Sequence, residues 1–178
     1  MKEILLHVCC GPCATHSIIE LEQESFDVTL FFSNSNIHPK EEYLRRLNSL
    51  KTYVEKVNTP LIIDNYNPKE WLDQVKDYEE SPEGGKRCEI CIKNRLKKTA
   101  EYAKAHGFEW FTTTLTISPH KNAEIINKIG KKLGEENQIN FLLKNFKKKD
   151  GFKKSLIISK DHDLYRQNYC GCIYSARK

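Results

Sequence analysis

The sequence of 178 residues lacks any apolar run near the ~20 residues that a membrane-spanning helix requires. Its first apolar stretch, within Met1–His7, is too short for a secretory signal and is interrupted by His7. No repeat or low-complexity tract is present, and apolar residues recur in periodic blocks, which excludes a disordered chain. These absences predict a folded cytoplasmic protein with no membrane partner.

The sequence also lacks a glycine-rich phosphate-binding loop. The segment Cys9-Cys10-Gly11-Pro12-Cys13 follows the first predicted strand, where such a loop would lie. It offers one glycine, and Pro12 has no backbone N–H that could donate to a phosphate. We therefore expect no ATP in the reaction.

What is present is a regular alternation of strand and helix patterns. The predicted strands are 4–8, 28–32, 60–64, 110–114 and 139–143. The predicted helices are 14–24, 40–57, 68–77, 89–105, 121–134 and a C-terminal segment. This alternation predicts an α/β fold with a mostly parallel sheet and helices on both faces. The length suits a single domain over residues 1–178.

Chemically active residues follow the predicted strands. Cys9, Cys10 and Cys13 come after the first strand, and the turn from Asn34 to His38 comes after the second. Asp64 ends the third strand, and Thr112–Thr114 end the fourth. Ligands of parallel sheets bind at the carboxyl ends of the strands, so we expect these residues to converge on one edge.

The seven cysteines form three groups, and none stands alone: Cys9, Cys10 and Cys13; Cys88 and Cys91; Cys170 and Cys172. Cysteines used as small core residues would be scattered, and a reducing compartment disfavours structural disulfides. Grouping at ligand spacing therefore indicates metal or redox chemistry. Cys88 and Cys91 flank a predicted helix start, where the helix dipole favours the thiolate.

Three chemistries compete for these thiols. Two CxxC pairs, Cys10–Cys13 and Cys88–Cys91, would suit a structural zinc but leave three cysteines unexplained. An iron–sulfur cluster takes four thiolates and leaves three for another iron or a redox pair. The tetrapeptide Cys10-Gly11-Pro12-Cys13 is that of thioredoxins, but it follows the first strand, and Cys9 stands where a thioredoxin has tryptophan.

Positive charge is concentrated in one segment. Residues 144–154 hold six lysines against Asp150, which accounts for the whole net charge of +5. A basic segment on an otherwise neutral chain suits a phosphate backbone, although it also suits a solvated loop. We predict that Lys147, Lys148 and Lys149, with Lys153 and Lys154, contact a nucleic acid.

With these residues in view, the chain resembles the QueH-type epoxyqueuosine reductases over essentially its whole length. The ordered motifs that carry the resemblance are His7–Cys13, Asn34–Pro39 with Tyr43 and Arg46, Arg87–Cys91, Thr112–Asn122 and Leu164–Cys172. Two departures are small: Gly11 stands where the family usually has alanine, and Asn145 stands where aspartate is common. Cys13 occupies a position at which the family has cysteine or aspartate.

The resemblance implies a Rossmann-like sheet of the HUP type and reduction of the epoxide of epoxyqueuosine at the tRNA wobble position. It implies a 4Fe-4S cluster next to a second iron, no cobalamin, and an external electron donor. One division of thiolates puts Cys9, Cys10, Cys88 and Cys91 on the cluster, and Cys13, Cys170 and Cys172 on the iron or in a redox pair. The rival division puts Cys10, Cys88, Cys91 and Cys172 on the cluster, and Cys9, Cys13 and Cys170 on the iron.

Other site residues are expected from their positions in these motifs. His38, Tyr165 and Asp64 are candidate proton donors, although a structural role is equally open for each. The predicted substrate-binding residues, besides the basic segment, are Asn34, Asn36, Thr113, Thr114, Lys121 and Arg166. The alternatives to a reductase are a thiol–disulfide oxidoreductase and a zinc-stapled RNA-binding module.

Overall fold

The computed structural model describes residues 1–176, which build one five-stranded sheet with helices packed on it. The strands are β1 (Lys2–His7), β2 (Phe26–Phe32), β3 (Leu61–Ile63), β4 (Trp110–Thr113) and β5 (Asn140–Phe141). The α-helices are α1 (Gly11–Gln23), α2 (Lys40–Val57), α3 (Pro68–Val75), α4 (Lys86–Ala105), α5 (Ala123–Asn137) and α6 (Gly151–Asp161). Short 3-10 turns, η1 (Lys76–Tyr78) and η2 (Thr114–Ile117), follow α3 and β4.

Every strand pair is parallel, and the strand order is β3-β2-β1-β4-β5. This order begins at the centre of the sheet with β1, winds outward through β2 and β3, and then reverses to β4 and β5. The reversal creates a switch point next to β1, where ligands of such sheets bind. The predicted α/β class with a mostly parallel sheet is confirmed.

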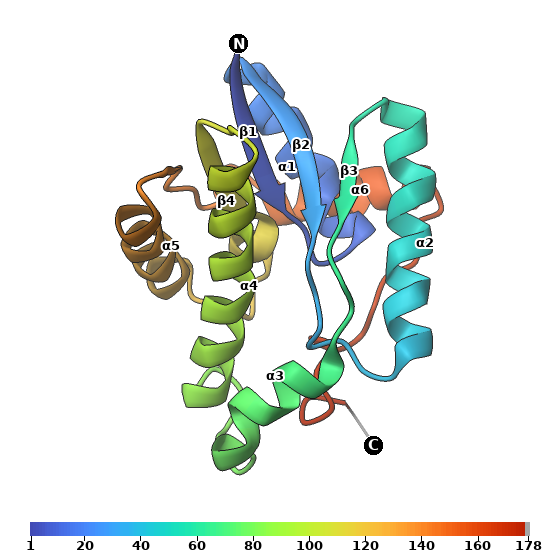
Figure 1. Cartoon of the computed structure of the whole chain (residues 1–178). Helices are drawn as coiled ribbons and strands as arrows, with labels where there is room; N and C mark the ends of the chain where they lie inside the picture. The colour runs from blue at the N-terminus through green and yellow to red at the C-terminus, as the bar shows by residue number, and fades with distance from the viewer. Residues whose placement is uncertain (177–178) are drawn as a thin grey trace.

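Helices cover both faces of the sheet, with α4 in front of it and α1 and α6 behind it in the view of Figure 1. Alternate residues of the central strands supply the two cores, because successive side chains of a strand point to opposite faces. Ile4, Leu6 and Leu30 pack in the core that includes α1 and α2, whereas Leu5 and Phe31 pack in the core that includes α4 and α5. Among residues 1–176, no helix is both long and apolar enough to cross a membrane.

Most element boundaries differ by a few residues from those expected, and four of the differences bear on the site. Helix α1 begins at Gly11 rather than at residue 14, because Cys10 caps it: its Sγ accepts a hydrogen bond from the backbone N–H of Cys13. Helix α4 begins at Lys86, so Cys88 and Cys91 lie within its first two turns. Thr114 belongs to η2 rather than to a strand, and β5 is only two residues long.

The chain after α6 forms no helix or strand as far as residue 176. It runs back to the carboxyl ends of the strands and ends near α3 (Figure 1). This segment, residues 162–176, carries the last two cysteines of the sequence to the edge where Cys9 lies. The third cysteine group is therefore the last in the sequence but lies close to the first group in the structure.

Candidate metal centre

Two cavities open at the carboxyl edge of the sheet, and together they expose six of the seven cysteines. The small cavity, of about 130 Å³, is lined by Cys88, Cys91, Cys170 and Cys172. The large cavity, of about 700 Å³, is lined by Cys9, Cys13 and Cys170. Because Cys170 borders both cavities, the three cysteine groups predicted to converge do meet at one place.

Cys9, Cys10 and Cys13 form the three-thiol group, whose sulfur atoms all lie within 4.8 Å of one another. Cys9 and Cys10 Sγ are 3.8 Å apart. The group lies between the end of β1 and the first turn of α1, and Gln167 Nε2 lies 3.0 Å from Cys10 Sγ. Within residues 1–176, no other three side chains of cysteine, histidine, aspartate or glutamate bring their ligand atoms this close together.

The charges within the three-thiol group are unequal. Burial raises the pKa of Cys10 to about 12. Hydrogen bonds with Cys10 and Cys9 raise the pKa of Cys13, whereas hydrogen bonds from Cys10 and Cys13 lower the pKa of Cys9 well below its usual value. Within this group, Cys9 is therefore the thiol that loses its proton most readily.

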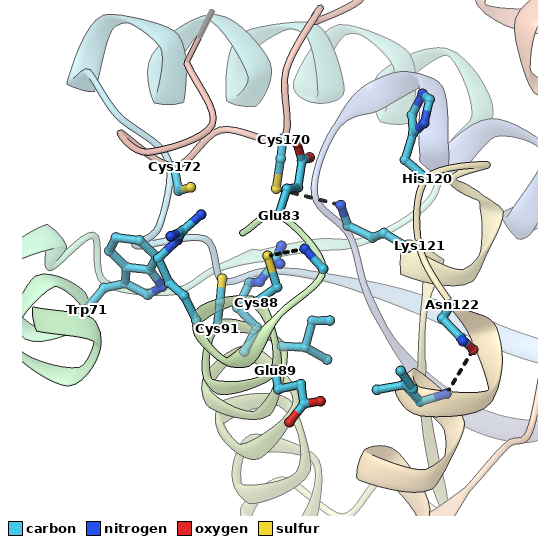
Figure 2. Close-up of a pocket in the computed structure, with 15 residues that line it drawn as sticks. Trp71, Glu83, Cys88, Glu89, Cys91, His120, Lys121, Asn122, Cys170 and Cys172 are labelled. Carbon is cyan, nitrogen blue, oxygen red and sulfur yellow. Dashed lines mark hydrogen bonds between the residues drawn. The ribbon is translucent and has the colours of Figure 1, made fainter. Parts of the chain in front are cut away.

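The four cysteines of the small cavity come from two elements that face each other (Figure 2). Cys88 and Cys91 project from the first turns of α4, and Cys170 and Cys172 project from the C-terminal segment opposite. All four are free thiols. Burial raises the pKa of Cys91, and the charge of Arg95 opposes this rise.

Two basic side chains, Arg95 and Lys121, line both cavities. Lys121 Nζ lies 3.6 Å from Cys170 Sγ (Figure 2). Burial disfavours the charge of Lys121, but Cys170, Cys9 and Cys91 outweigh it and raise the pKa of the lysine. Both cavities therefore bring cysteine sulfur together with cationic nitrogen.

The small cavity fits a cofactor that brings its own hydrogen-bond acceptors. Three buried N–H groups on its lining residues have no acceptor within residues 1–176: Trp71 Nε1, Arg87 Nε and Arg95 Nε. Buried donors without partners are rare, because each costs about 1–3 kcal/mol. The sulfides of an iron–sulfur cluster accept such hydrogen bonds, and thiolates are the ligands that these clusters take.

Comparison with known proteins agrees with this geometry. A sequence model of the family described as Epoxyqueuosine reductase QueH matches residues 4–178. The chain belongs to this family. It is 43% identical to the epoxyqueuosine reductase QueH of Streptococcus pyogenes serotype M1, over 98% of this chain and 70% of the relative. It is 38% identical to that of Thermotoga maritima, over 98% of this chain and 91% of the relative.

A solved structure with a similar fold is that of a predicted subunit of tRNA methyltransferase from Methanocaldococcus jannaschii. Its TM-score is 0.60 over 90% of this chain and 76% of that one, with 12% sequence identity. At this identity the likeness concerns the fold alone. This likeness agrees with the α/β class that the parallel sheet and its helices indicate.

In this QueH family member, a buried clamp holds the C-terminal segment against α2. Arg46 donates to the backbone carbonyls of Tyr169 and Cys170, at 3.0 and 2.9 Å, and its Nε donates to Glu42 at 3.0 Å. Gly171 fits beside the guanidinium because its φ is +124° and a Cβ there would lie 3.0 Å from Arg46 Nη1. Arg46 belongs to one of the motifs that carry the family resemblance, and its donors are engaged by the protein itself.

Several predicted site residues belong to a polar network within the QueH fold. His7 is fully buried, and its ring nitrogens contact Thr113 Oγ1 at 2.9 Å and Asn34 Oδ1 at 3.2 Å. Burial lowers the pKa of His7 to about 4, so the ring is neutral. Asn34 Nδ2 also donates to the carbonyl of Val8, at 2.8 Å. The amide of Asn34 and the hydroxyl of Thr113 therefore brace the ends of β1, β2 and β4.

The candidate proton donors lie apart from the two cavities. Neither His38 nor Tyr165 lines either cavity, and the Tyr165 hydroxyl donates to the carboxylate of Glu42, at 2.8 and 2.9 Å. Asn36 is buried, and its amide has no partner among residues 1–176. Asp64 accepts from Ser33 Oγ at 2.7 Å. The catalytic roles of His38 and Tyr165 and the substrate contact of Asn36 stay predictions.

Other predicted substrate-binding residues line the large cavity. Thr114 Oγ1 lies 4.0 Å from Cys9 Sγ, and Arg166 is exposed at the cavity wall. Lys147 instead donates to the carbonyls of Ser118 and Lys121, at 2.9 and 2.7 Å, which fixes the loop that carries Lys121. Lys148 and Lys149 are exposed.

Three residues of the site were not predicted from the sequence: His7, Arg95 and Gln167. A signal for Arg95 existed, because it follows Cys91 by four positions and a helix places such residues on one face. Cys10 and Gln167 are 157 positions apart, so no spacing rule could have joined them.

Proposed function

We propose that this chain reduces epoxyqueuosine in tRNA to queuosine. The observation that carries the proposal is the family match over residues 4–178 on a chain in which six of the seven cysteines line two cavities. Removing the epoxide oxygen consumes two electrons and two protons and yields an alkene and water. An external one-electron donor supplies the electrons.

We propose a 4Fe-4S cluster in the small cavity and a single iron at the three-thiol group. Ligands of a tetrahedral ion with bonds of about 2.3 Å lie roughly 3.8 Å apart, which suits the close packing of Cys9, Cys10 and Cys13. The small cavity is lined by four cysteines whose sulfur atoms are packed less closely, namely Cys88, Cys91, Cys170 and Cys172. This looser arrangement suits a cluster of several atoms. This division differs from both that were expected from the sequence, because each of those separates cysteines that lie side by side.

Iron held at these sites supplies electrons and a Lewis acid for the epoxide oxygen. The protein itself provides the large cavity beside Cys9, Cys13 and Cys170, whose volume of about 700 Å³ is within the usual range for ligand pockets. Phe152 and Tyr169 offer aromatic surface there for a base withdrawn from the anticodon stack. Lys121 holds a proton at Nζ next to Cys170, where it can reach a developing alkoxide.

The geometry argues against a thiol–disulfide oxidoreductase. Such enzymes use a thiolate whose pKa is depressed at a helix N-terminus. In the Cys10–Cys13 pair, however, burial raises the pKa of Cys10 to about 12, and hydrogen bonds with Cys10 and Cys9 raise the pKa of Cys13. A pair in this state is a poor nucleophile.

Anaerobically purified protein is expected to contain iron and inorganic sulfide and to convert epoxyqueuosine in tRNA to queuosine. Conversion is measured by mass spectrometry of the digested tRNA as the loss of one oxygen atom per nucleoside. Unmodified tRNA is the control. Colourless protein that contains zinc and leaves epoxyqueuosine unchanged would contradict the proposal and favour a zinc-stapled RNA-binding module.

The exposed lysines on and before α6 are expected to bind the tRNA backbone. Lys153 and Lys154 lie between Phe152 and Ser155 on α6, and Phe152 and Ser155 line the large cavity. Changing Lys148, Lys149, Lys153 and Lys154 to glutamine should weaken tRNA binding. It should also flatten the dependence of log K on log salt by about 0.7–0.9 for each phosphate that the protein no longer neutralises.

The matched control changes four exposed lysines of α4 and α5 to glutamine: Lys97, Lys128, Lys131 and Lys132. It removes the same charge away from α6. Equal salt slopes in the two variants, measured by filter binding, would exclude the lysines of the basic segment as the contact surface. Lys144 and Lys147 are left in place because Lys144 pairs with Glu20 and Lys147 holds the Ser118–Lys121 loop.

A further inference from the structure

Arg95 is a buried cation without a carboxylate partner among residues 1–176. Its side chain projects from α4 one turn beyond Cys91, and the residue is 3% exposed. None of the ion pairs within residues 1–176 includes it. Its Nε has no hydrogen-bond acceptor in that part of the chain. Buried charges are normally paired, because an unpaired one costs several kcal/mol.

The position of Arg95 indicates that it faces the negative charge of the two thiol sites. The residue lines the small cavity, together with the four cysteines there, and also the large cavity, together with Cys9 and Cys13. Lys121 is the second basic residue that lines both cavities, and its ammonium contacts Cys170, the cysteine that the two cavities share. No other lysine or arginine among the described residues lines both.

We infer that Arg95 and Lys121 form a shared counter-charge for the two thiol sites and raise the reduction potential of the iron held there. Each one-electron reduction adds a negative charge between the thiolates, and a neighbouring cation stabilises the reduced form more than the oxidised one. Charge and N–H donors near the sulfurs are established determinants of cluster potential. The inference rests on the proposed function, because it assumes that iron occupies these cavities.

The two cations differ in the part they play. Arg95 projects from helix α4, and its Nε has no acceptor among residues 1–176. It can therefore donate to a sulfur ligand and also supply charge. Lys121 lies on the loop after η2, and Lys147 holds that loop through its carbonyls. Lys121 can therefore be removed without opening the core beneath α4, which makes it the safer of the two sites to change.

The test is a redox titration of the iron-loaded protein with dithionite, followed by absorbance and electron paramagnetic resonance. Arg95→Met and Lys121→Met are each expected to shift the equilibrium at least tenfold toward the oxidised form. A tenfold shift lowers the one-electron midpoint potential by about 59 mV. Arg95→Lys keeps the charge and is expected to shift the potential less than Arg95→Met. Lys97→Met, which removes an exposed charge on the same helix, is expected to leave it unchanged.

The outcomes separate this inference from the proposed function. Iron-loaded Arg95→Met and Lys121→Met variants with the potential of the unaltered protein would overturn the inference and leave the reductase proposal standing. If Arg95→Met fails to fold or to bind iron, the Lys121→Met result decides. An unaltered protein that binds zinc and no redox-active iron would overturn the proposed cofactor, and the inference with it.

Discussion

Replacing Cys91 with serine is expected to abolish epoxide reduction and to remove the inorganic sulfide together with about four iron atoms per chain. Cys91 is buried on α4, in one cluster with Trp71, in the wall of the small cavity. A serine hydroxyl in this apolar wall is a poor ligand for iron, and three thiolates do not hold a cluster as firmly as four. Iron and sulfide analysis of anaerobically purified protein measures the loss directly.

The contrasting change is made in the three-thiol group. Cys13→Ser is expected to lower iron by about one atom per chain, to leave sulfide unchanged, and also to abolish reduction, because one ion is held there and no cluster. Cys13→Asp, which keeps an anionic ligand for iron, is expected to retain that atom. If Cys13→Ser lost sulfide to the same extent as Cys91→Ser, the proposed division of the cysteines would be wrong.

The sheet could be predicted because its signals are local. Each strand is an apolar run of a few residues, and each helix shows its own periodicity. The succession of strands and helices along the chain, and with it the fold class, therefore follows from the sequence alone. Helix starts were less certain, since they depend on caps that involve unusual groups. The Sγ of Cys10 caps α1, and a cysteine is not among the side chains normally expected at that position.

Which cysteines lie together could not be derived from spacing. Cys170 and Cys172 reach the site on a segment without regular structure, so neither strand nor helix geometry fixes where they lie. Their position is set by Arg46, more than 120 positions earlier in the chain, through hydrogen bonds to backbone carbonyls. Such hydrogen bonds carry no sequence pattern, because any residue supplies a carbonyl.

The roles of the individual lysines in residues 144–154 could not be derived from the sequence either. The composition of this segment does not distinguish among the six lysines, and Lys144 forms ion pairs with Glu20 and Glu24. Lys147 donates to two carbonyls, whereas Lys148 and Lys149 face solvent. Charge counting could locate the segment but could not tell which ammonium groups were already engaged within the protein.

Arg46→Met is expected to lower the free energy of unfolding of the metal-free protein by about 3–5 kcal/mol, the usual cost of removing one partner of a buried ion pair. Glu42 would keep only Tyr165 and the distant, exposed Arg45 as partners, and the carbonyls of Tyr169 and Cys170 would lose their donors. The part of the C-terminal segment that carries Cys170 and Cys172 would lose its two hydrogen bonds to α2, although Tyr165 would still hold the segment to Glu42. Iron content should therefore fall as well.

Urea denaturation of the metal-free variant measures the first effect, and iron analysis measures the second. Arg45→Met is the matched control: its side chain is 61% exposed and its guanidinium lies 3.9 Å from Glu42, so the expected change is within about 0.5 kcal/mol. If Arg46→Met kept its stability and its iron, the clamp would not be what positions Cys170 and Cys172. The segment would then be held by its other contacts, such as those of the Tyr165 hydroxyl with Glu42 and of the Gly171 carbonyl with the His38 N–H.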